Sequence, residues 1–577
     1  MSLKKYLEDL EPAKREVLLG RETKDALHEA FAAKRVVHAG LLGTPVMKDA
    51  QQEAWAKVMA EPADARRQHA VYIHIPFCQT KCLYCSFFQN ASRQSVEDEY
   101  IDDLLTEMKR DAQQKQLQTA VIDSVFIGGG TPTSLSPANA ARLLQGIKEC
   151  FHLAADCELT LEGRIHDLVP EKIETWLKYG VNRISLGVQS FDTSLRRRVG
   201  RIDAREEVLR RLELLKSYDV TVIVDLIYGL PGQTKELWLE DIKTLLATDV
   251  DGMDLYQLNI FPGGDLDKAL QSGRIPACAD IAGQADLYMA ARDLLLGEGI
   301  ERLSLCHWRR HKREHSRYNT MAKTGAVVYP FGCGAGGNCG GLSFMQQRGL
   351  KSYSQAVRAG QKPIMMMAHQ VEQKLQMISD TVIANLEKGF VDFRQLCLVD
   401  SRFEELEEVL ELWKERGLMT EDLGIYRLTK VGEFWYISLT QSLIECMQAI
   451  CQSEDTASSP TEAGQENDCY QGIGTANQHK KKPRTFCTGP SGHSIPYSLY
   501  SFSLAFLSLR ASKKSCKRPS AFIRLNKAAT RSSPSFNPSL NPSLNPSLRS
   551  SIIHCSNSEL IANTSSLLYY SFSQSLV

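Results

Sequence analysis

The sequence predicts an α/β fold built on a parallel sheet, either doubly wound or curled into a partial barrel. Strand-like runs recur six times in the first half of the chain, and the first of them alternates and is rich in β-branched and aromatic residues. They are Ala70–Phe77, Asp123–Ile127, Glu158–Glu162, Arg183–Val188, Thr221–Ile227 and Asp254–Ile260. Helical patterns separate these runs, and repeated strand–helix alternation implies parallel strands joined by right-handed crossovers.

The helical patterns are amphipathic segments of about two to five turns. They are expected at Val96–Lys115, Ala138–Glu149, Glu171–Tyr179 and Ala204–Leu215. In both sheet architectures ligands bind at the C-terminal ends of the strands. The unusual cysteine and glycine motifs of this chain follow strands, so we expect the functional site at that edge of the sheet.

The chain divides into five predicted segments, of which four are ordered. Residues 1–69 are expected to form an N-terminal helical segment, and residues 70–300 the barrel core. Residues 301–369 would extend the barrel and contribute to the substrate region. Residues 370–447 would form a small C-terminal helical domain. Within it, Gly417–Trp435 resembles the hairpin of a winged helix, with plain helical packing as the alternative.

The last predicted segment, residues 448–577, has a different composition. From Cys469 to Val577 it contains 13 Lys or Arg and one acid, so the remainder of this uncharged chain carries a net −12. It is rich in Ser and repeats NPSL within Asn537–Leu548. Low-complexity disorder is the prediction, and a polybasic binding arm is the alternative. We expect a chain that ends near residue 455 to retain activity.

The overall composition is that of a globular protein, with 43% hydrophobic and 24% charged residues. A formal net charge of zero gives no indication of nucleic acid or an anionic membrane as partner. No apolar run approaches the ~20 residues that span a bilayer, and no secretory signal is recognisable. The expected location is therefore cytoplasmic, where the 16 cysteines would be thiols or metal ligands.

Three cysteines follow the first predicted strand in the pattern CxxxCxxC, at Cys78, Cys82 and Cys85. Because a loop after a strand can wrap around a metal centre, these thiols can converge on an iron–sulfur cluster. Three ligands leave one iron open, which suits a cluster that binds a substrate. A zinc knuckle, which would need a fourth ligand, and ordinary buried cysteines are the alternatives.

A glycine-rich motif, GGGTPT at Gly128–Thr133, ends the second predicted strand. Its glycines would let a ligand approach the backbone, whose N–H and C=O groups can bind an amino acid's carboxylate and ammonium. Tight turns use the same residues. The motif is informative because it accompanies the cysteine motif.

Together the two motifs resemble the radical SAM superfamily, in which an aromatic residue, here Tyr84, precedes the third cysteine. YIHIPFC (Tyr72–Cys78), ISLGVQSF (Ile184–Phe191) and DLIYGLPGQT (Asp225–Thr234) are similar to the branch that contains oxygen-independent coproporphyrinogen dehydrogenase. The resemblance implies a (β/α)6 partial TIM barrel. It also implies a [4Fe–4S] cluster whose open iron chelates S-adenosylmethionine (SAM), and whose reduction releases a 5′-deoxyadenosyl radical.

The resemblance further implies which residues contact SAM. The matching positions are Tyr72, Tyr84, Gly129, Gly130, Thr131, Glu162, Gln189, Arg201 and Asp225. Carboxylates at strand ends can accept hydrogen bonds from ribose hydroxyls, and an Arg can pair with the SAM carboxylate. The alternative for Glu162 and Asp225 is a structural salt bridge, and for Arg201 it is a solvated helix face.

Two departures from family patterns bear on the substrate. Coproporphyrinogen dehydrogenases of this type have a further Cys two residues after the cluster motif, where this chain has Phe87. The branch's haem chaperones have a His-Asn…Tyr-Trp signature where this chain has Cys306–His315, CHWRRHKREH. CSFF, CHWRR and RYN resemble the haem-utilisation members (HutW/ChuW type), anaerobic methyltransferases that open the haem ring and release its iron.

This last resemblance implies haem or a related tetrapyrrole as substrate and an electron donor such as flavodoxin. On a helix, His307, His311 and His315 would share one face, and any of them could ligate haem iron. Arg309 and Arg310 could pair with the propionates, and a solvated basic surface is the alternative. Haem methylation with ring opening, haem delivery by a chaperone and coproporphyrinogen dehydrogenation are the three functions left open.

Overall fold

The computed structural model describes residues 2–36, 38–41, 43–87 and 90–452. Contacts divide the chain into two compact units, and every described residue belongs to the first. The predicted tail begins at residue 448, but residues 448–452 still belong to the last helix, Lys430–Gln452, because its apolar periodicity continues to Ile450. The rest of the predicted tail, residues 453–577, lies outside the described residues.

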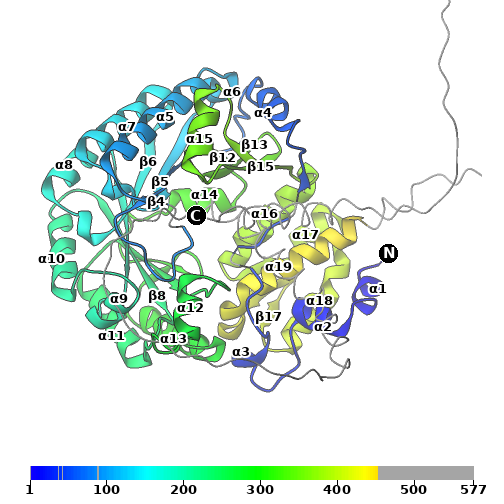
Figure 1. The fold of residues 1–577 in the computed structure, drawn as a ribbon. Coiled ribbons are helices and arrows are strands. Elements are labelled where there is room, and N and C mark those ends of the chain that lie inside the picture. Colours follow the sequence, from blue (N-terminus) through cyan, green and yellow to red (C-terminus); the bar gives the residue numbers. More distant parts are fainter. Residues whose placement is uncertain (1, 37, 42, 88–89, 453–577) are drawn as a thin grey trace, which may run out of the picture. The chain divides into compact units, whose positions relative to one another are not determined.

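A thirteen-stranded sheet forms the core of this unit (Figure 1). Six parallel strands lie side by side at its centre in sequence order. These are β2 (His69–Ile75), β5 (Ile122–Gly129), β6 (Leu153–Gly163), β7 (Arg183–Gln189), β8 (Thr221–Tyr228) and β9 (Gly252–Gln257). They confirm the predicted α/β fold, and their β-branched and leucine side chains form the buried core, as Ile73, Ile127 and Leu186 illustrate.

Helices lie in an arc outside these strands (Figure 1). They are α5 (Gln94–Ala112), α6 (Lys115–Thr119), α7 (Pro137–Cys150), α8 (Pro170–Lys178), α9 (Thr193–Arg198), α10 (Arg205–Lys216), α11 (Lys235–Ala247), α12 (Asp265–Gln271) and α13 (Ile281–Gly297). Side chains cap several of them: Ser136 accepts the N–H of Asn139 at the start of α7, and Thr234 accepts that of Leu237 at the start of α11. Such caps mark the starts of α7, α9, α11 and α13, whereas the other five of these helices begin without one.

The sheet extends beyond the six strands at both edges, through strands that the sequence analysis did not identify individually. On one side β12 (Val327–Phe331) pairs in parallel with β2. It is followed by the antiparallel strands β13 (Gly336–Cys339), β14 (Leu342–Gln346), β15 (Ile364–His369) and β1 (Thr44–Pro45). On the other side β11 (His307–Arg309) pairs antiparallel with β9, and β10 (Glu301–Arg302) pairs with β11. His307, His311 and His315 consequently share no helical face, because His307 lies on a strand.

The C-terminal part contains a three-stranded antiparallel sheet packed with helices. Its elements are α16 (Gln373–Glu387), β16 (Phe390–Asp392), α17 (Phe393–Val399), η3 (Ser401–Leu406), α18 (Glu407–Glu415), β17 (Met419–Asp422) and β18 (Ile425–Leu428). This order of helices and strands is that of a winged helix, the first of the two alternatives. α19 (Lys430–Gln452) follows the hairpin.

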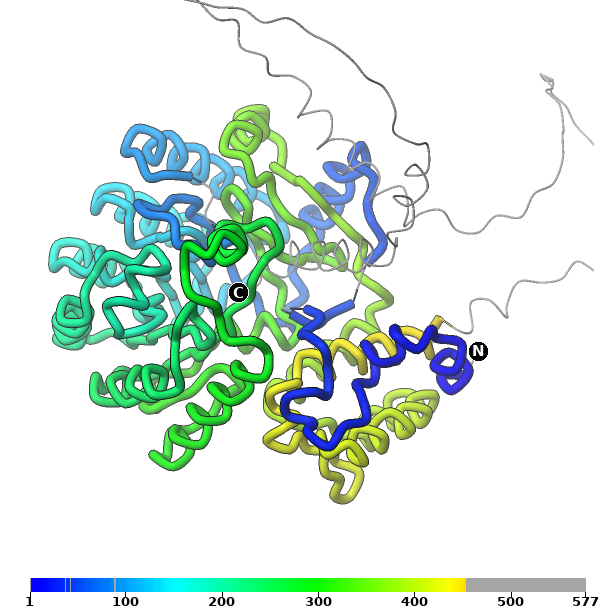
Figure 2. Tube along the Cα trace, turned by 60° about the horizontal axis from the view of Figure 1, so that its bottom comes forward, coloured from blue at the N-terminus to red at the C-terminus, as the bar shows by residue number. Residues whose placement is uncertain are grey.

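The two ends of the described chain pack together, as Figure 2 shows for the blue and yellow segments. α1 (Leu3–Glu8), α2 (Pro12–Leu19) and α3 (Ala26–Glu29) all contact α19. The indole of Trp435 donates to the carbonyl of Ala26 over 2.9 Å, and that of Trp413 to the carbonyl of Leu19 over 3.1 Å. The N-terminal helices and the winged helix thus form one assembly.

The remaining elements are short. They are α4 (Gln51–Met59), β3 (Phe77–Cys78), β4 (Asn90–Ala91), η1 (Pro132–Ser134), η2 (Ile165–Asp167), α14 (Arg317–Lys323) and α15 (Leu350–Arg358). Across the described part of the chain, no helix has both the length and the apolar character that crossing a bilayer requires.

Candidate active site

The cysteine loop leaves the C-terminal end of β2 and is surrounded by cations. Cys78 and Cys82 are buried and Cys85 is half-buried. Cys78 Sγ lies 3.3 Å from Thr131 Oγ1 and 3.5 Å from an Arg164 guanidinium nitrogen. Burial raises the pKa of Cys78. At Cys82 burial is outweighed by three arginines, chiefly Arg201, and by a hydrogen bond with Tyr84, which together lower the pKa of the thiol. A positive environment of this kind stabilises thiolates, the form that ligates iron.

The geometry does not favour the zinc alternative. A single zinc ion holds four ligand atoms within about 2.3 Å of itself. Within the described ranges, no three His, Cys, Asp or Glu side chains converge in a way that could hold a metal ion. In an iron–sulfur cluster each thiolate binds a different iron, so the thiols stand farther apart. The donor set, three free thiols in one loop, is the type of ligand that an iron–sulfur cluster uses.

Tyr84 and Arg201 connect this loop to the end of β7. Arg201 lies beyond α9, is 9% exposed, and donates to the Tyr84 hydroxyl over 3.0 Å. A solvated helix face is therefore excluded for Arg201. Gln189 at the end of β7 has a positive φ of 73°, and its buried Oε1 accepts no hydrogen bond from a described residue. An unpaired acceptor beside the cluster loop fits a site for a polar ligand.

The glycine-rich turn requires glycine at two positions. Gly129 has a φ of +113°, and a Cβ there would lie 2.7 Å from the ring of His74. A Cβ on Gly130 would clash with the carbonyl oxygen of Phe77. The Gly129 N–H donates to the Glu162 carboxylate over 3.1 Å. The turn therefore packs closely against the strand that leads to Cys78.

Two carboxylates line the inside of the barrel without cationic partners. Neither Glu162 on β6 nor Asp225 on β8 forms an ion pair with a described residue, which argues against the salt-bridge alternative. Removal from water raises the pKa of Glu162 to about 8 and that of Asp225 to about 7. The Ser185 hydroxyl donates to Asp225 over 3.1 Å. Tyr72, also inside the barrel, shares a 3.1 Å hydrogen bond with His74.

The raised pKa of Glu162 predicts a pH-dependent contribution to stability. The native state holds this proton up to about pH 8, whereas an unfolded chain releases it near 4.5. The contribution is therefore complete below pH 4.5 and is lost as the pH rises through 8. Between pH 5 and 9, the thermal midpoint of Glu162→Gln should fall less than that of the wild type. Glu149→Gln, at an exposed carboxylate, is the control, and an equal fall in both variants would contradict the assignment.

His307 lies in a buried network at the side of the barrel. Its Nδ1 is 2.8 Å from Asp254, and its Nε2 is 3.1 Å from Glu314, which Arg183 holds through two hydrogen bonds of 2.9 and 3.0 Å. Burial opposes the charge, but these acids raise the pKa of His307 to about 9. Since both ring nitrogens are engaged, the structure does not support His307 as an iron ligand.

The basic residues after His307 lie away from the cluster. Arg309 opposes Gly252, the first residue of β9, so the segment runs toward the N-terminal ends of the strands. Arg309 pairs with Glu301, and Arg310 pairs with Asp249 over 2.9 Å. His311 also pairs with Asp249, and His315 is exposed. The predicted propionate site is not assembled here; the alternative, a solvated basic surface, fits.

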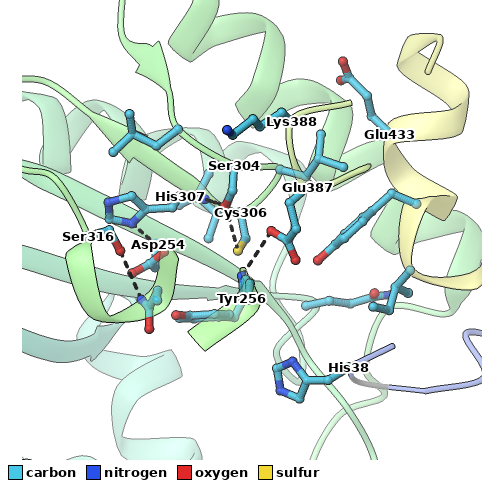
Figure 3. Close-up of a pocket in the computed structure, with 18 of the residues that line it drawn as sticks. His38, Asp254, Tyr256, Ser304, Cys306, His307, Ser316, Glu387, Lys388 and Glu433 are labelled. Carbon is cyan, nitrogen blue, oxygen red and sulfur yellow. Dashed lines mark hydrogen bonds and ion pairs between the residues drawn. The ribbon is translucent and has the colours of Figure 1, made fainter. Parts of the chain in front are cut away.

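A cavity adjoins the barrel on the side of the C-terminal part (Figure 3). Its lining comes from the N-terminal segment, the ends of β8 and β9, residues 303–307, and the helices α13, α14, α16 and α19. It includes Lys34, His38, Cys306 and the four tyrosines Tyr228, Tyr256, Tyr288 and Tyr436. Sequence reasoning missed these residues except for Cys306, because they come from segments far apart in the chain and form no local motif.

Comparison with known proteins agrees with this geometry. Residues 72–245 match the radical SAM superfamily. The chain is 35% identical to the anaerobilin synthase of Escherichia coli O157:H7 over 409 residues, which are 70% of this chain and 90% of that protein. It is 30% identical to the haem chaperone HemW of Bacillus subtilis over 49% of this chain and 74% of that protein.

Among solved structures, the coproporphyrinogen III oxidase HemN of Escherichia coli superposes with a TM-score of 0.60 at 20% identity. The match covers 72% of this chain and 96% of HemN. At 20% identity the match shows similarity of fold alone. The sequence identity with anaerobilin synthase, over nine-tenths of its length, shows that this chain belongs to the radical SAM superfamily of enzymes, in the branch related to anaerobilin synthase.

Proposed function

We propose that this protein acts on haem under anaerobic conditions: it methylates a carbon of the porphyrin, opens the ring and releases the iron. The observation that carries the proposal is the extent of the similarity to anaerobilin synthase. It spans more than twice the length of the radical SAM match and so includes regions outside the catalytic barrel. The similarity to a haem chaperone is lower in identity and in coverage, and it leaves delivery of intact haem as the second candidate.

The cofactors are assigned to the residues around the cysteine loop. Cys78, Cys82 and Cys85 would hold a [4Fe–4S] cluster, and SAM would bind beside it. When bound and reduced by one electron, the two supply a 5′-deoxyadenosyl radical. Backbone groups of Gly129, Gly130 and Thr131 would orient the amino-acid part of SAM. The side chains of Tyr72, Tyr84, Glu162, Gln189, Arg201 and Asp225 would complete the pocket.

The position of the cavity supports a tetrapyrrole substrate next to SAM. Asp254 and Tyr256 line the cavity from β9, and Asp254 lies beside Asp225 of β8 in the sheet register. Burial raises the pKa of Tyr256, and the carboxylates of Asp254 and Asp225 raise this pKa further. A substrate in the cavity would thus lie across one strand from the proposed ribose site. An electron donor such as flavodoxin would deliver the electron, and residues 1–69 and 370–447 would form the outer wall.

Iron release distinguishes the candidate functions. The reconstituted full-length enzyme is incubated anaerobically with SAM, a reductant and haem, and free ferrous iron is measured with a chromogenic chelator. We expect iron in proportion to the haem consumed, and none without SAM. A chaperone would return intact haem and no iron. Loss of propionate carboxyl groups from coproporphyrinogen III, with haem unchanged, would instead indicate the dehydrogenase activity.

A further inference from the structure

Lys34 lies in the cavity without a carboxylate partner. Its ammonium group stands 4.6 Å from the centre of the Phe434 ring, and it forms no ion pair with any residue that the structure describes. Burial lowers the pKa of Lys34 to about 7. A buried ammonium group without a partner destabilises the folded protein unless an anion binds beside it. The cavity is therefore suited to a ligand with a negative charge.

The acids that line the cavity are already paired. Glu387 binds Lys323 over 3.1 Å, Glu433 binds Arg302 over 2.8 Å, and Asp254 binds His307. Among the described lining residues, the charge left over is thus positive, from Lys34 and from the exposed Lys388.

His38 is the histidine of the cavity with both ring nitrogens available. Neither is within hydrogen-bonding distance of another described residue. Its ring lines the cavity together with Lys323, whose positive charge favours the neutral imidazole, the form that offers a nitrogen lone pair. The other candidate ligands are blocked: His307 uses both nitrogens, and burial raises the pKa of the Cys306 thiol to about 12, so it stays protonated.

The walls of the cavity are aromatic. Tyr228, Tyr256, Tyr288 and Tyr436 all lie near Cys306, and Phe434 adds a fifth ring. The Tyr288 hydroxyl is buried and has no partner among the described residues. Flat rings with unpaired polar groups suit a flat conjugated ligand that carries polar substituents.

We propose that this cavity binds an anionic iron tetrapyrrole, with His38 as a ligand to the iron and Lys34 as the partner of a propionate carboxylate. The inference rests on the proposed function and locates its substrate. The volume of the cavity is about 160 Å³, below the roughly 300–1,000 Å³ of common ligand sites. Entry of a porphyrin therefore requires the lining groups to move apart. Lys34 and His38, the two residues assigned to the ligand, both lie on the N-terminal segment of the lining.

Haem titration of His38→Ala tests the iron ligand. In the full-length reconstituted protein, we expect the variant to have a shifted Soret band. Its affinity for haem should be lower than that of the wild type by about tenfold or more. Added imidazole should restore the wild-type spectrum. His311→Ala, which removes a histidine bound to Asp249 outside the cavity, is the matched control and should leave both properties unchanged. If His38→Ala bound haem with the wild-type spectrum and affinity, His38 would not be the ligand.

The contact between Lys34 and a propionate is tested by the Lys34→Met variant, whose binding of haem is compared with its binding of haem dimethyl ester. A charge-assisted hydrogen bond predicts a loss of haem affinity of about tenfold or more. The same variant should bind haem dimethyl ester as the wild type does, because the ester has no carboxylate. Lys48→Met, at an exposed lysine, is the control. Equal losses for haem and its diester would contradict the contact and point to altered packing.

A wrong cavity assignment and a wrong proposed function would give different experimental results. If the wild-type protein bound haem and released its iron but the His38 and Lys34 variants behaved like their controls, the cavity assignment would be wrong and the proposed function would stand. If the wild-type protein neither bound haem nor released iron, the proposed function would fall, and the cavity assignment with it.

Discussion

Replacing Cys78, Cys82 or Cys85 by Ala should abolish the iron–sulfur cluster and the formation of 5′-deoxyadenosine together. Each thiol is one of only three in the loop, so the loss of one leaves too few ligands to hold four irons. The cationic groups around the loop would also lose the negative charge that balances them, since Arg201 and Arg164 both act on Cys82. Iron and sulfide analysis, with chromatography of the nucleoside products, measures both losses.

A matched cysteine outside the loop separates this effect from a general loss of thiols. Cys157 on β6 is half-buried, and its nearest described acceptor, the Glu158 carbonyl, lies 3.9 Å away. Cys157→Ala should keep the full iron content and wild-type cleavage of SAM. A triple loop variant that still contained four irons per chain would disprove the assignment of the cluster to these cysteines.

Arg183→Met should destabilise the fold by about 3–5 kcal/mol. The guanidinium donates two hydrogen bonds to Glu314, and the two side chains are 4% and 0% exposed. Without Arg183, the buried carboxylate retains only His307 as a partner, and His307 is shared with Asp254. Denaturant unfolding under anaerobic conditions measures the difference in free energy.

The matched control is an exposed ion pair of similar geometry. Arg210 and Glu207 form a 2.7 Å pair on the surface of α10, and Arg210→Met should change stability little because solvent screens the pair. The double variant Arg183→Met with Glu314→Gln should lose less than twice the single effect, since it leaves no unpaired charge. If Arg183→Met were as stable as Arg210→Met, the network would not support the barrel.

The central strands and the cluster loop could be predicted because their signals are local. The predicted strand Arg183–Val188 differs from β7 by one residue, since β-branched runs bounded by turns identify buried parallel strands. The cysteine and glycine motifs lie within single turns at strand ends. Parallel topology then brings them to one edge, where Thr131 contacts Cys78 and Gly129 contacts Glu162.

The substrate region could not be predicted, because tertiary pairing decides it. His307–His315 has helical spacing, yet pairing with β9 makes His307 part of a strand and directs Arg309 to the far end of the sheet. Lys34 and His38 stand in a segment without a motif. They become notable only because packing of the N-terminal helices on α19 places them in a cavity with Cys306.

The most direct test of the proposed function is the mass of the tetrapyrrole recovered after anaerobic turnover with SAM labelled with ¹³C in its methyl group. The account predicts a linear, iron-free product that carries one added carbon and is one mass unit heavier than the product from unlabelled SAM. Recovery of intact, unlabelled haem after SAM has been cleaved would contradict it.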